Sequence, residues 1–235
     1  MAHGTPLWYL AALCFFICIG TNHSWQNDPD CGTAPITDPG SNIIGGSDAD
    51  TGEWPWHAAF FVNDQEEVRC GATIITPEWA LTAANCIGFV QYPEIYSVVG
   101  GLTDLRSGGG QQQLRQVAEI FIHPQYTWSD NEYDIAALKL ASPFVITDYV
   151  RTICVPQQSL EDYIVPGTPC EVTGWGSTTE TGYIYPVLQE MNVDIVSQEY
   201  CQSQYPDDEI TDNMICAGVA GDGKDTCNWK PFCWT

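Results

Sequence analysis

Short apolar runs, each bounded by Gly, Pro, Asn or Asp, dominate the chain from Ile43 onward. They are rich in Val, Ile, Thr and aromatic residues, which favours β-strands. The best helical segment, 197–204, is short, and no long stretch shows a 3.6-residue period. Regularly spaced short strands predict an all-β sandwich or barrel. The runs are HAAFFVN (57–63), GATIITP (71–77), IYSVVGG (95–101), VAEIFIHP (117–124), DIAALKLA (134–141) and CEVTGWG (170–176).

The N-terminus predicts export. The segment from Leu7 to Gly20 is an apolar run of fourteen residues, too short to cross a bilayer comfortably, and polar residues follow it. This pattern indicates a signal peptide over residues 1–20, followed by a propeptide-like linker over 21–42 that holds a glycosylation sequon at Asn22. Eleven cysteines also favour an oxidising compartment. We therefore expect a secreted protein.

The charge of the chain excludes two classes of partner. Thirty acidic residues and seven basic ones give a formal net charge of −23. Such a chain repels the phosphate backbone of nucleic acids, and it lacks the basic clusters that bind anionic membranes. We expect a protein or peptide partner, no nucleic acid and no stable membrane anchor.

Several motifs carry a family resemblance, in the family's order and rough spacing. The most specific is CGATIITPEWALTAANC (70–86), and the chain from about Cys31 to Cys227 resembles the chymotrypsin-like serine endopeptidases of the trypsin type. The resemblance implies two packed antiparallel β-barrels, the first over about 43–142 and the second over about 143–235, with the second incomplete at its C-terminus. The other motifs are IIGG (43–46), WPW (54–56), IFIHPQY (120–126), YDIAALKL (133–140), CEVTGWG (170–176), NMICAG (213–218) and GKDTC (223–227).

The catalytic triad implied by the resemblance is only partly present. The family uses a serine nucleophile, a histidine base and a buried aspartate that orients the histidine. Asp134 matches the aspartate, but Asn85 stands where the histidine belongs, in Thr-Ala-Ala-Asn-Cys. The Gly-Asp-Ser-Gly-Gly run expected after Cys227 is absent, so the nucleophile is missing from these 235 residues. Because an amide is not a base near neutral pH, the chain is expected to be inactive.

Other family features are also incomplete. Asn42 precedes the Ile43 at which the family is cut, and no Lys or Arg occurs before Arg69. Asp225 matches the carboxylate of the pocket that binds Arg and Lys, and we interpret it as a relic of that pocket. The segment 100–113 offers only Asp104 as a carboxylate, so no metal and no cofactor are expected.

Two histidines elsewhere in the domain are expected to be structural. His57 follows the WPW turn, and His123 matches a surface strand position of the family.

The cysteines divide into implied pairs and remaining thiols. Removing the leader takes away Cys14 and Cys18 and leaves an odd number, so one thiol stays free, bonds another molecule or has a partner missing from this chain. The resemblance implies the pairs Cys31–Cys154, Cys70–Cys86 and Cys201–Cys216. It leaves Cys170, Cys227 and Cys233 as candidates for an unpaired thiol, with Cys233 able to replace a missing family partner.

Three functional interpretations follow. The first is a secreted, catalytically inactive protease homologue that acts by binding. The second is an incomplete chain of an active serine endopeptidase that cleaves after Arg or Lys, which accounts for the missing serine but not for Asn85. The third is a non-functional structural fragment.

Overall fold

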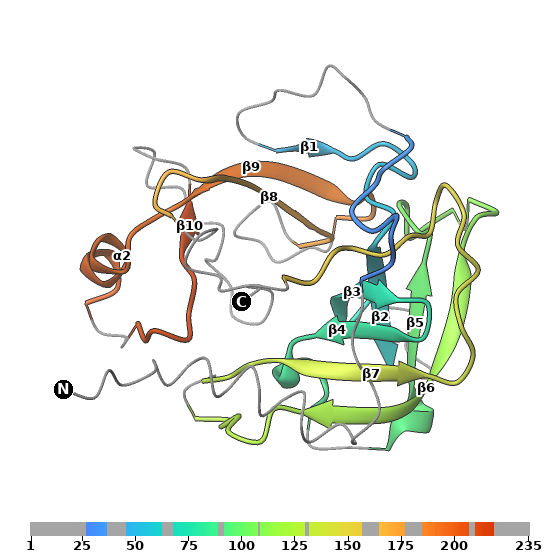
Figure 1. Cartoon of the computed structure of the whole chain (residues 1–235), viewed down its shortest axis with the longest axis horizontal. Coiled ribbons are helices and arrows are strands. Elements are labelled where there is room, and N and C mark those ends of the chain that lie inside the picture. Colours follow the sequence, from blue (N-terminus) through green and yellow to red (C-terminus); the bar gives the residue numbers. More distant parts are fainter. Residues whose placement is uncertain are drawn as a thin grey trace.

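The computed structural model describes residues 27–36, 46–62, 68–88, 92–107, 109–129, 132–156, 165–176, 185–206 and 210–218. Within these ranges the chain forms a closed barrel and a second sheet, joined by the segment after β7 (Figure 1). No helix of the described part is long and apolar enough to span a bilayer. The strands are β1 (Ser47–Asp48), β2 (His57–Val62), β3 (Cys70–Thr76), β4 (Trp79–Thr82), β5 (Tyr96–Gly100), β6 (Gln113–Ile122), β7 (Ala136–Leu140), β8 (Pro169–Gly174), β9 (Gln189–Ile195) and β10 (Ala217–Gly218). The helices are the 3₁₀ turns η1 (Ala84–Cys86) and η2 (Pro93–Ile95) and the α-helix α2 (Gln198–Gln204).

The first barrel is closed and antiparallel, as the resemblance predicts. Its strands follow the order β2-β3-β4-β7-β6-β5, and β2 closes the ring by pairing with both β3 and β5. Every strand expected from the sequence within this barrel is present, with ends shifted by a few residues. Closure removes the free edges of the sheet, which leaves a single packed interior.

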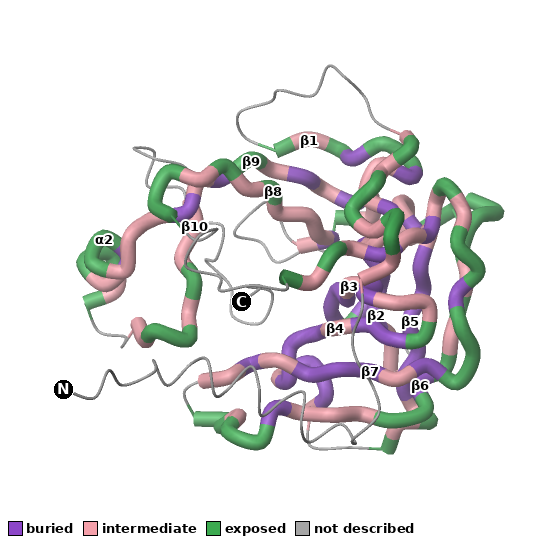
Figure 2. Tube along the Cα trace, in the orientation of Figure 1, coloured by how far each residue is buried: buried purple, intermediate pink, exposed green. Residues whose placement is uncertain are grey.

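The barrel interior is filled by large apolar side chains. Phe60, Ile74, Tyr96 and Leu138 are fully buried, and the rings of Phe60 and Tyr96 stack with centroids 5.1 Å apart. Figure 2 shows the buried residues concentrated along these strands, whereas α2 is largely exposed. The rigid part of the molecule is therefore the barrel that carries Asn85 on its η1 turn.

The segment after residue 142 extends this core. Phe144 and Val150 are buried in the same cluster as the barrel strands, and the Phe144 N–H donates to the carbonyl of Pro77. The sequence boundary near 142 thus does not mark a change of core, because Phe144 and Val150 pack into the core cluster of the barrel. Conversely, β1 precedes the barrel strands in the sequence but pairs with β9 of the second sheet.

The second sheet is built around β9. β8 pairs with β9 along its whole length, from Pro169 opposite Asp194 to Gly174 opposite Gln189. β1 and β10 pair with the two ends of β9, and all pairings are antiparallel. The described part of 143–235 therefore forms an open sheet, and residues 219–235 lie outside the described ranges.

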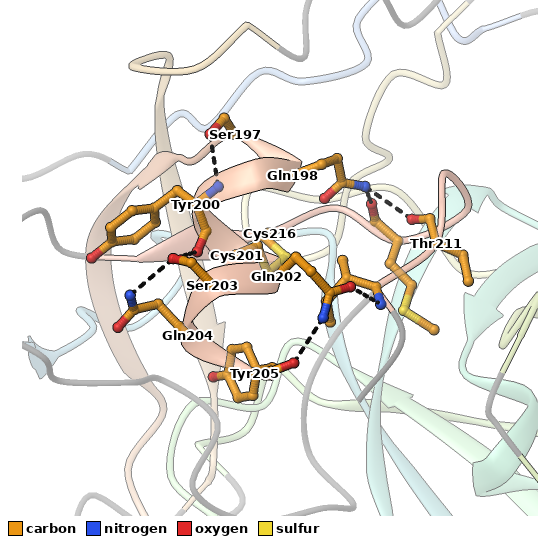
Figure 3. Close-up of a disulfide and its surroundings, with 12 residues drawn as sticks. Ser197, Gln198, Tyr200, Cys201, Gln202, Ser203, Gln204, Tyr205, Thr211 and Cys216 are labelled. Carbon is orange, nitrogen blue, oxygen red and sulfur yellow. Dashed lines mark hydrogen bonds between the residues drawn. A yellow bond between two sulfur atoms is a disulfide. The ribbon is translucent and has the colours of Figure 1, made fainter. Parts of the chain in front are cut away.

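Helix α2 confirms the helix predicted at 197–204. Its N-cap Ser197 accepts a hydrogen bond from the Tyr200 N–H, which satisfies one of the free donors of the first turn (Figure 3). The Gln198 side chain donates to the carbonyls of Thr211 and Met214, so it joins the helix to the segment that leads into β10.

All three disulfides implied by the resemblance are present in the structure. They are Cys31–Cys154, Cys70–Cys86 and Cys201–Cys216. Within the described ranges Cys170 is a free thiol, half-buried on β8. Cys227 and Cys233 lie outside the described residues.

Candidate functional site

Asp134 lies at the entrance to β7, where the chain makes a sharp turn. Tyr133 has a φ of 55°, a conformation that is uncommon for a residue with a side chain. The Ile135 N–H donates to the carbonyl of Tyr133 over 2.7 Å, and the His123 N–H donates to the carbonyl of Ile135. This turn directs the Asp134 carboxylate inward, and the residue is only 8% exposed.

Asn85 approaches that carboxylate from the η1 turn. Its neighbours Ala84 and Cys86 are buried, and the Cys70–Cys86 disulfide ties the turn to β3. The Asn85 backbone N–H donates to Asp134 Oδ1 over 2.8 Å, and its side-chain Nδ2 donates to Oδ2 over 2.6 Å. Both oxygens of the buried carboxylate are therefore hydrogen-bonded to one residue.

Burial shifts the pKa of the Asp134 carboxyl group. Loss of water raises the pKa of Asp134 above its usual value, while the backbone N–H groups of Asn85 and Ala84 and the Asn85 amide oppose the rise. The hydrogen bonds thus compensate only part of the desolvation.

The pair can hold a hydrogen-bond network but cannot move a proton as a histidine would. A carboxamide donates through its nitrogen and accepts through its oxygen, and neither atom is basic near neutral pH. The arrangement keeps Asp134 satisfied in a buried position, and residue 85 itself offers no basic atom.

His57 is built into the contact between the barrel and the second sheet. Its Nδ1 lies 3.0 Å from the Thr173 hydroxyl, and its ring lies 4.9 Å from that of Trp175. Burial lowers the pKa of His57 to about 4, so it is neutral at physiological pH.

The prediction of a surface position for His123 was wrong. The residue is buried just after β6, its ring stacks on Tyr133 with centroids 4.7 Å apart, and its Nδ1 accepts from the Gln125 N–H. The turn at Tyr133 folds back over the end of β6, and this long-range contact leaves no signal in the local sequence.

Two predicted residues remain, Asp225 and Asp104. Asp225 lies outside the described residues. Asp104 forms an ion pair with Arg106 at 2.8 Å, and the Arg106 hydrogen bonds lower the pKa of Asp104 to about 2. Across the described ranges, no three His, Cys, Asp or Glu side chains are grouped to hold a metal ion.

One contact beside the site was not predicted. The Asn213 amide donates to Glu132 Oε2 over 2.9 Å, which links the segment before Asp134 to the segment after α2. Asn213 is exposed and Glu132 is half-buried, and both are common polar residues, so nothing in the sequence pattern distinguishes them.

Comparison with known proteins agrees with this geometry. Residues 43–230 match the protein family described as Trypsin. The chain is 38% identical over 202 residues to Transmembrane protease serine 9 of Rattus norvegicus, covering 85% of this chain and 18% of that protein. It is 36% identical over 199 residues to Atrial natriuretic peptide-converting enzyme of Mus musculus, covering 84% of this chain and 17% of that protein. The chain therefore spans less than a fifth of the length of these two curated relatives.

Proposed function

The chain belongs to the trypsin family of serine proteases, and from this premise we propose that it is a secreted, proteolytically inactive member that acts by binding a protein or peptide. The observation that carries the proposal is the bonding of Asn85 to both oxygens of Asp134. In this family the side chain held by the aspartate accepts the proton of the nucleophile. An amide in that place preserves the packing and removes the proton acceptor.

The proposal of secretion is supported by disulfide chemistry. Three disulfides are formed within the described residues, and such bonds persist in oxidising compartments. The apolar run at 7–20 is consistent with export.

A binding role is supported by the preserved frame of the site. The barrel is closed and Asp134 keeps its buried position, so the surface around the former triad is held rigidly. A rigid, preformed surface binds with little loss of conformational entropy.

The second candidate is an active serine endopeptidase that cleaves after Arg or Lys. The observation that favours it is the position of Asp134, whose carboxylate would accept a hydrogen bond from an imidazole at residue 85 as it does from the amide. One relative is also named a protease and the other a peptide-converting enzyme.

Hydrolysis of an arginine amide substrate tests whether the chain is inactive as it stands. The purified chain is incubated with the substrate and with a fluorophosphonate, which labels activated serines, and trypsin serves as the positive control. We expect neither hydrolysis above buffer nor labelling. Hydrolysis that disappears on fluorophosphonate treatment contradicts the proposal.

A second experiment separates the two candidates by testing the role of Asn85. In a longer product that carries a Gly-Asp-Ser-Gly-Gly segment, the Asn85 form should stay inactive and Asn85→His should gain at least about 10⁴-fold. Activity of the Asn85 form would assign the chain to the active peptidases.

Cross-linking tests the binding role. The folded chain, carrying a photoreactive side chain in place of exposed Asn213, is exposed to extracellular fluid, and the same probe at exposed Glu78 on the barrel is the control. We expect a protein or peptide to be cross-linked to the probe at position 213 and not to the probe at position 78. Equal labelling at both positions contradicts a site beside Asp134.

A further inference from the structure

A buried carboxylate anchors β1 to the second sheet. Glu190 of β9 is 9% exposed, and each of its oxygens accepts a hydrogen bond. Oε1 accepts from the Ser47 hydroxyl over 3.1 Å, and Oε2 accepts from the Trp54 indole over 2.7 Å. Ser47 is also the cross-strand partner of Glu190 in β1. Glu190 therefore joins three segments: β1, the turn that carries Trp54, and β9.

A second carboxyl group reaches the same point. Glu53 precedes Trp54, and its Oε2 accepts a hydrogen bond from the Asp50 N–H over 2.8 Å. Its side chain comes within hydrogen-bonding reach of Glu190. Two carboxyl groups can bond to each other only if one of them carries a proton. Glu190 already accepts two hydrogen bonds, which favour its charged form, so the proton belongs on Glu53.

We propose that Glu53 carries a proton that it donates to Glu190, and that this hydrogen bond holds β1 against the second sheet in acidic solution and is lost as the pH rises. The proton comes from water and returns to it. When it leaves, two negative carboxylates face each other and repel. The contact between β1 and β9 then opens more often.

The small size of β1 makes this side-chain contact important. The strand has only two residues, Ser47 and Asp48, so few backbone hydrogen bonds hold it to β9. Just beyond it, the Ala49 N–H donates to the carbonyl of Leu188 over 2.8 Å. A change in the Glu190 contacts therefore changes a large part of what keeps this segment in place.

The charges around Glu53 favour its protonated form. Burial raises the pKa of the Glu53 carboxyl, and the negative charges of Glu190 and Asp50 raise it further, while the hydrogen bond from the Asp50 N–H opposes the rise. The charges that act on Glu53 from the described residues are thus all negative.

The other charged groups of this region have partners of their own. Asp48 of β1 accepts a hydrogen bond from the Gln189 amide, and Arg106, whose charge reaches Asp48, is paired with Asp104. On the β8 side of Glu190 lies Thr173, whose hydroxyl contacts His57. Burial lowers the pKa of His57 to about 4, so it adds no positive charge near neutral pH.

The direction of the pH effect follows from the raised pKa of Glu53. A carboxyl that binds its proton more tightly in the folded state contributes stability that is complete below its unfolded pKa of 4.5. This contribution is lost as the pH rises through the folded pKa. We therefore expect the Glu53–Glu190 contact to hold β1 more tightly at pH 4.5 than at about pH 7.5.

Hydrogen exchange at the Ala49 amide of the full chain tests the proposal, because this amide is exposed when the β1 contact opens. Glu53→Gln keeps an acceptor for the Asp50 N–H and offers Glu190 a donor at every pH. Rates are corrected for the intrinsic pH dependence of exchange. The ratio of Ala49 protection in Glu53→Gln to that in the unmodified protein should rise at least about threefold between pH 4.5 and about pH 7.5. A ratio that does not change with pH overturns the proposal.

Glu78→Gln is the matched control for charge. It removes the same negative charge from an exposed position on the barrel. His57 and Asp134 titrate alike in all three proteins, so their effects cancel in the ratios. The ratio for Glu78→Gln should stay constant with pH. A rise equal to that of Glu53→Gln would assign the effect to overall charge and overturn the proposal.

The titration of Glu53 provides a test that does not depend on the folding of Glu53→Gln. The carbon-13 chemical shift of the Glu53 carboxyl in the unmodified protein should change with a midpoint above pH 4.5. The midpoint should fall in Glu190→Gln, because the neighbouring negative charge is removed. A midpoint at or below pH 4.5 in the unmodified protein, or one that Glu190→Gln leaves unchanged, overturns the proposal.

Discussion

The amide of Asn85 satisfies a carboxylate that is largely buried. Asn85→Ala removes the Nδ2 donor and leaves Asp134 Oδ2 without that hydrogen bond. Because an unsatisfied buried polar group keeps its desolvation penalty, we expect the free energy of unfolding to fall by about 1–3 kcal/mol. Urea denaturation of the variant and the unmodified protein measures this difference.

An exposed amide provides the matched control for Asn85. Asn213→Ala also deletes a donor to a carboxylate, Glu132, but at the surface. It should change the unfolding free energy by less than about 0.5 kcal/mol. Equal losses in the two variants would show that burial of Asp134 does not matter.

His57 should make the stability depend on pH. Its pKa is lowered from 6.5 to about 4 by burial, so the unfolded chain takes up a proton in a range where the folded chain does not. This contribution is fully present above pH 6.5 and is lost as the pH falls toward about 4. Between pH 7 and pH 5 the loss amounts to about 2 kcal/mol.

Comparison with His57→Gln isolates this group. Glutamine can still hydrogen-bond to the Thr173 hydroxyl but does not titrate. The raised pKa of Asp134 acts in the opposite direction, because its contribution is lost as the pH rises, and it is common to both proteins. The unfolding free energies of the two proteins, measured in urea at several pH values, should converge as the pH falls. Parallel curves would show that His57 is accessible to solvent.

At the scale of single residues, the sequence could predict the residues that lie within a recognisable motif. The residues flanking Asp134 and Asn85 match both to triad positions of the family, and the structure joins the two residues by hydrogen bonds. The burial of His123 could not be predicted, because it depends on Tyr133 folding over it from ten residues away along the chain. The Asn213–Glu132 contact joins two polar residues distant in sequence and likewise has no local signal.

At the scale of elements, the loop between β5 and β6 depends on one glycine. Gly101 has a φ of +72°, and a Cβ atom there would lie 2.6 Å from the Gln111 carbonyl oxygen. Gly101→Ala combines an unfavourable backbone conformation with a clash, so the unfolding free energy should fall by more than about 2 kcal/mol. Thermal or urea unfolding measures the loss.

Gly110 of the same loop separates the two effects. Its φ is +73°, but nothing lies within 4 Å of the position of its Cβ atom. Gly110→Ala should therefore cost only about 1 kcal/mol, the conformational part alone. A loss as large as that of Gly101→Ala would mean that the clash contributes nothing.

Strands with clear patterns were the predictable elements. β2, β3 and β5 are β-branched or aromatic runs bounded by turn residues, and they occur where the sequence indicates them. β9, QEMNVDI, was not predicted because its buried positions include Glu190, which accepts from the Trp54 indole and the Ser47 hydroxyl. Its identity as a strand depends on these tertiary partners rather than on its own composition.

At the scale of the whole molecule, the charge is distributed unevenly. Residues 152–223 contain no Lys or Arg, whereas Arg106, Lys139 and Arg151 of the preceding part each form an ion pair with an acid. The second sheet and α2 therefore carry acidic side chains with no cation from their own segment. Mutual repulsion of these charges opposes the compact state.

Added salt should for this reason stabilise the folded chain. Raising sodium chloride from about 0.01 M to 0.3 M shortens the Debye length from about 30 Å to about 6 Å and screens the repulsion. The three ion pairs are partly exposed and contribute little, so their screening does not cancel the gain. We expect the free energy of unfolding in urea to rise by about 1–2 kcal/mol. A parallel series in sucrose of equal osmolality separates screening from solute exclusion, since sucrose cannot screen charge. If sucrose gives the same rise, or if salt lowers the stability, self-repulsion is not what limits this fold.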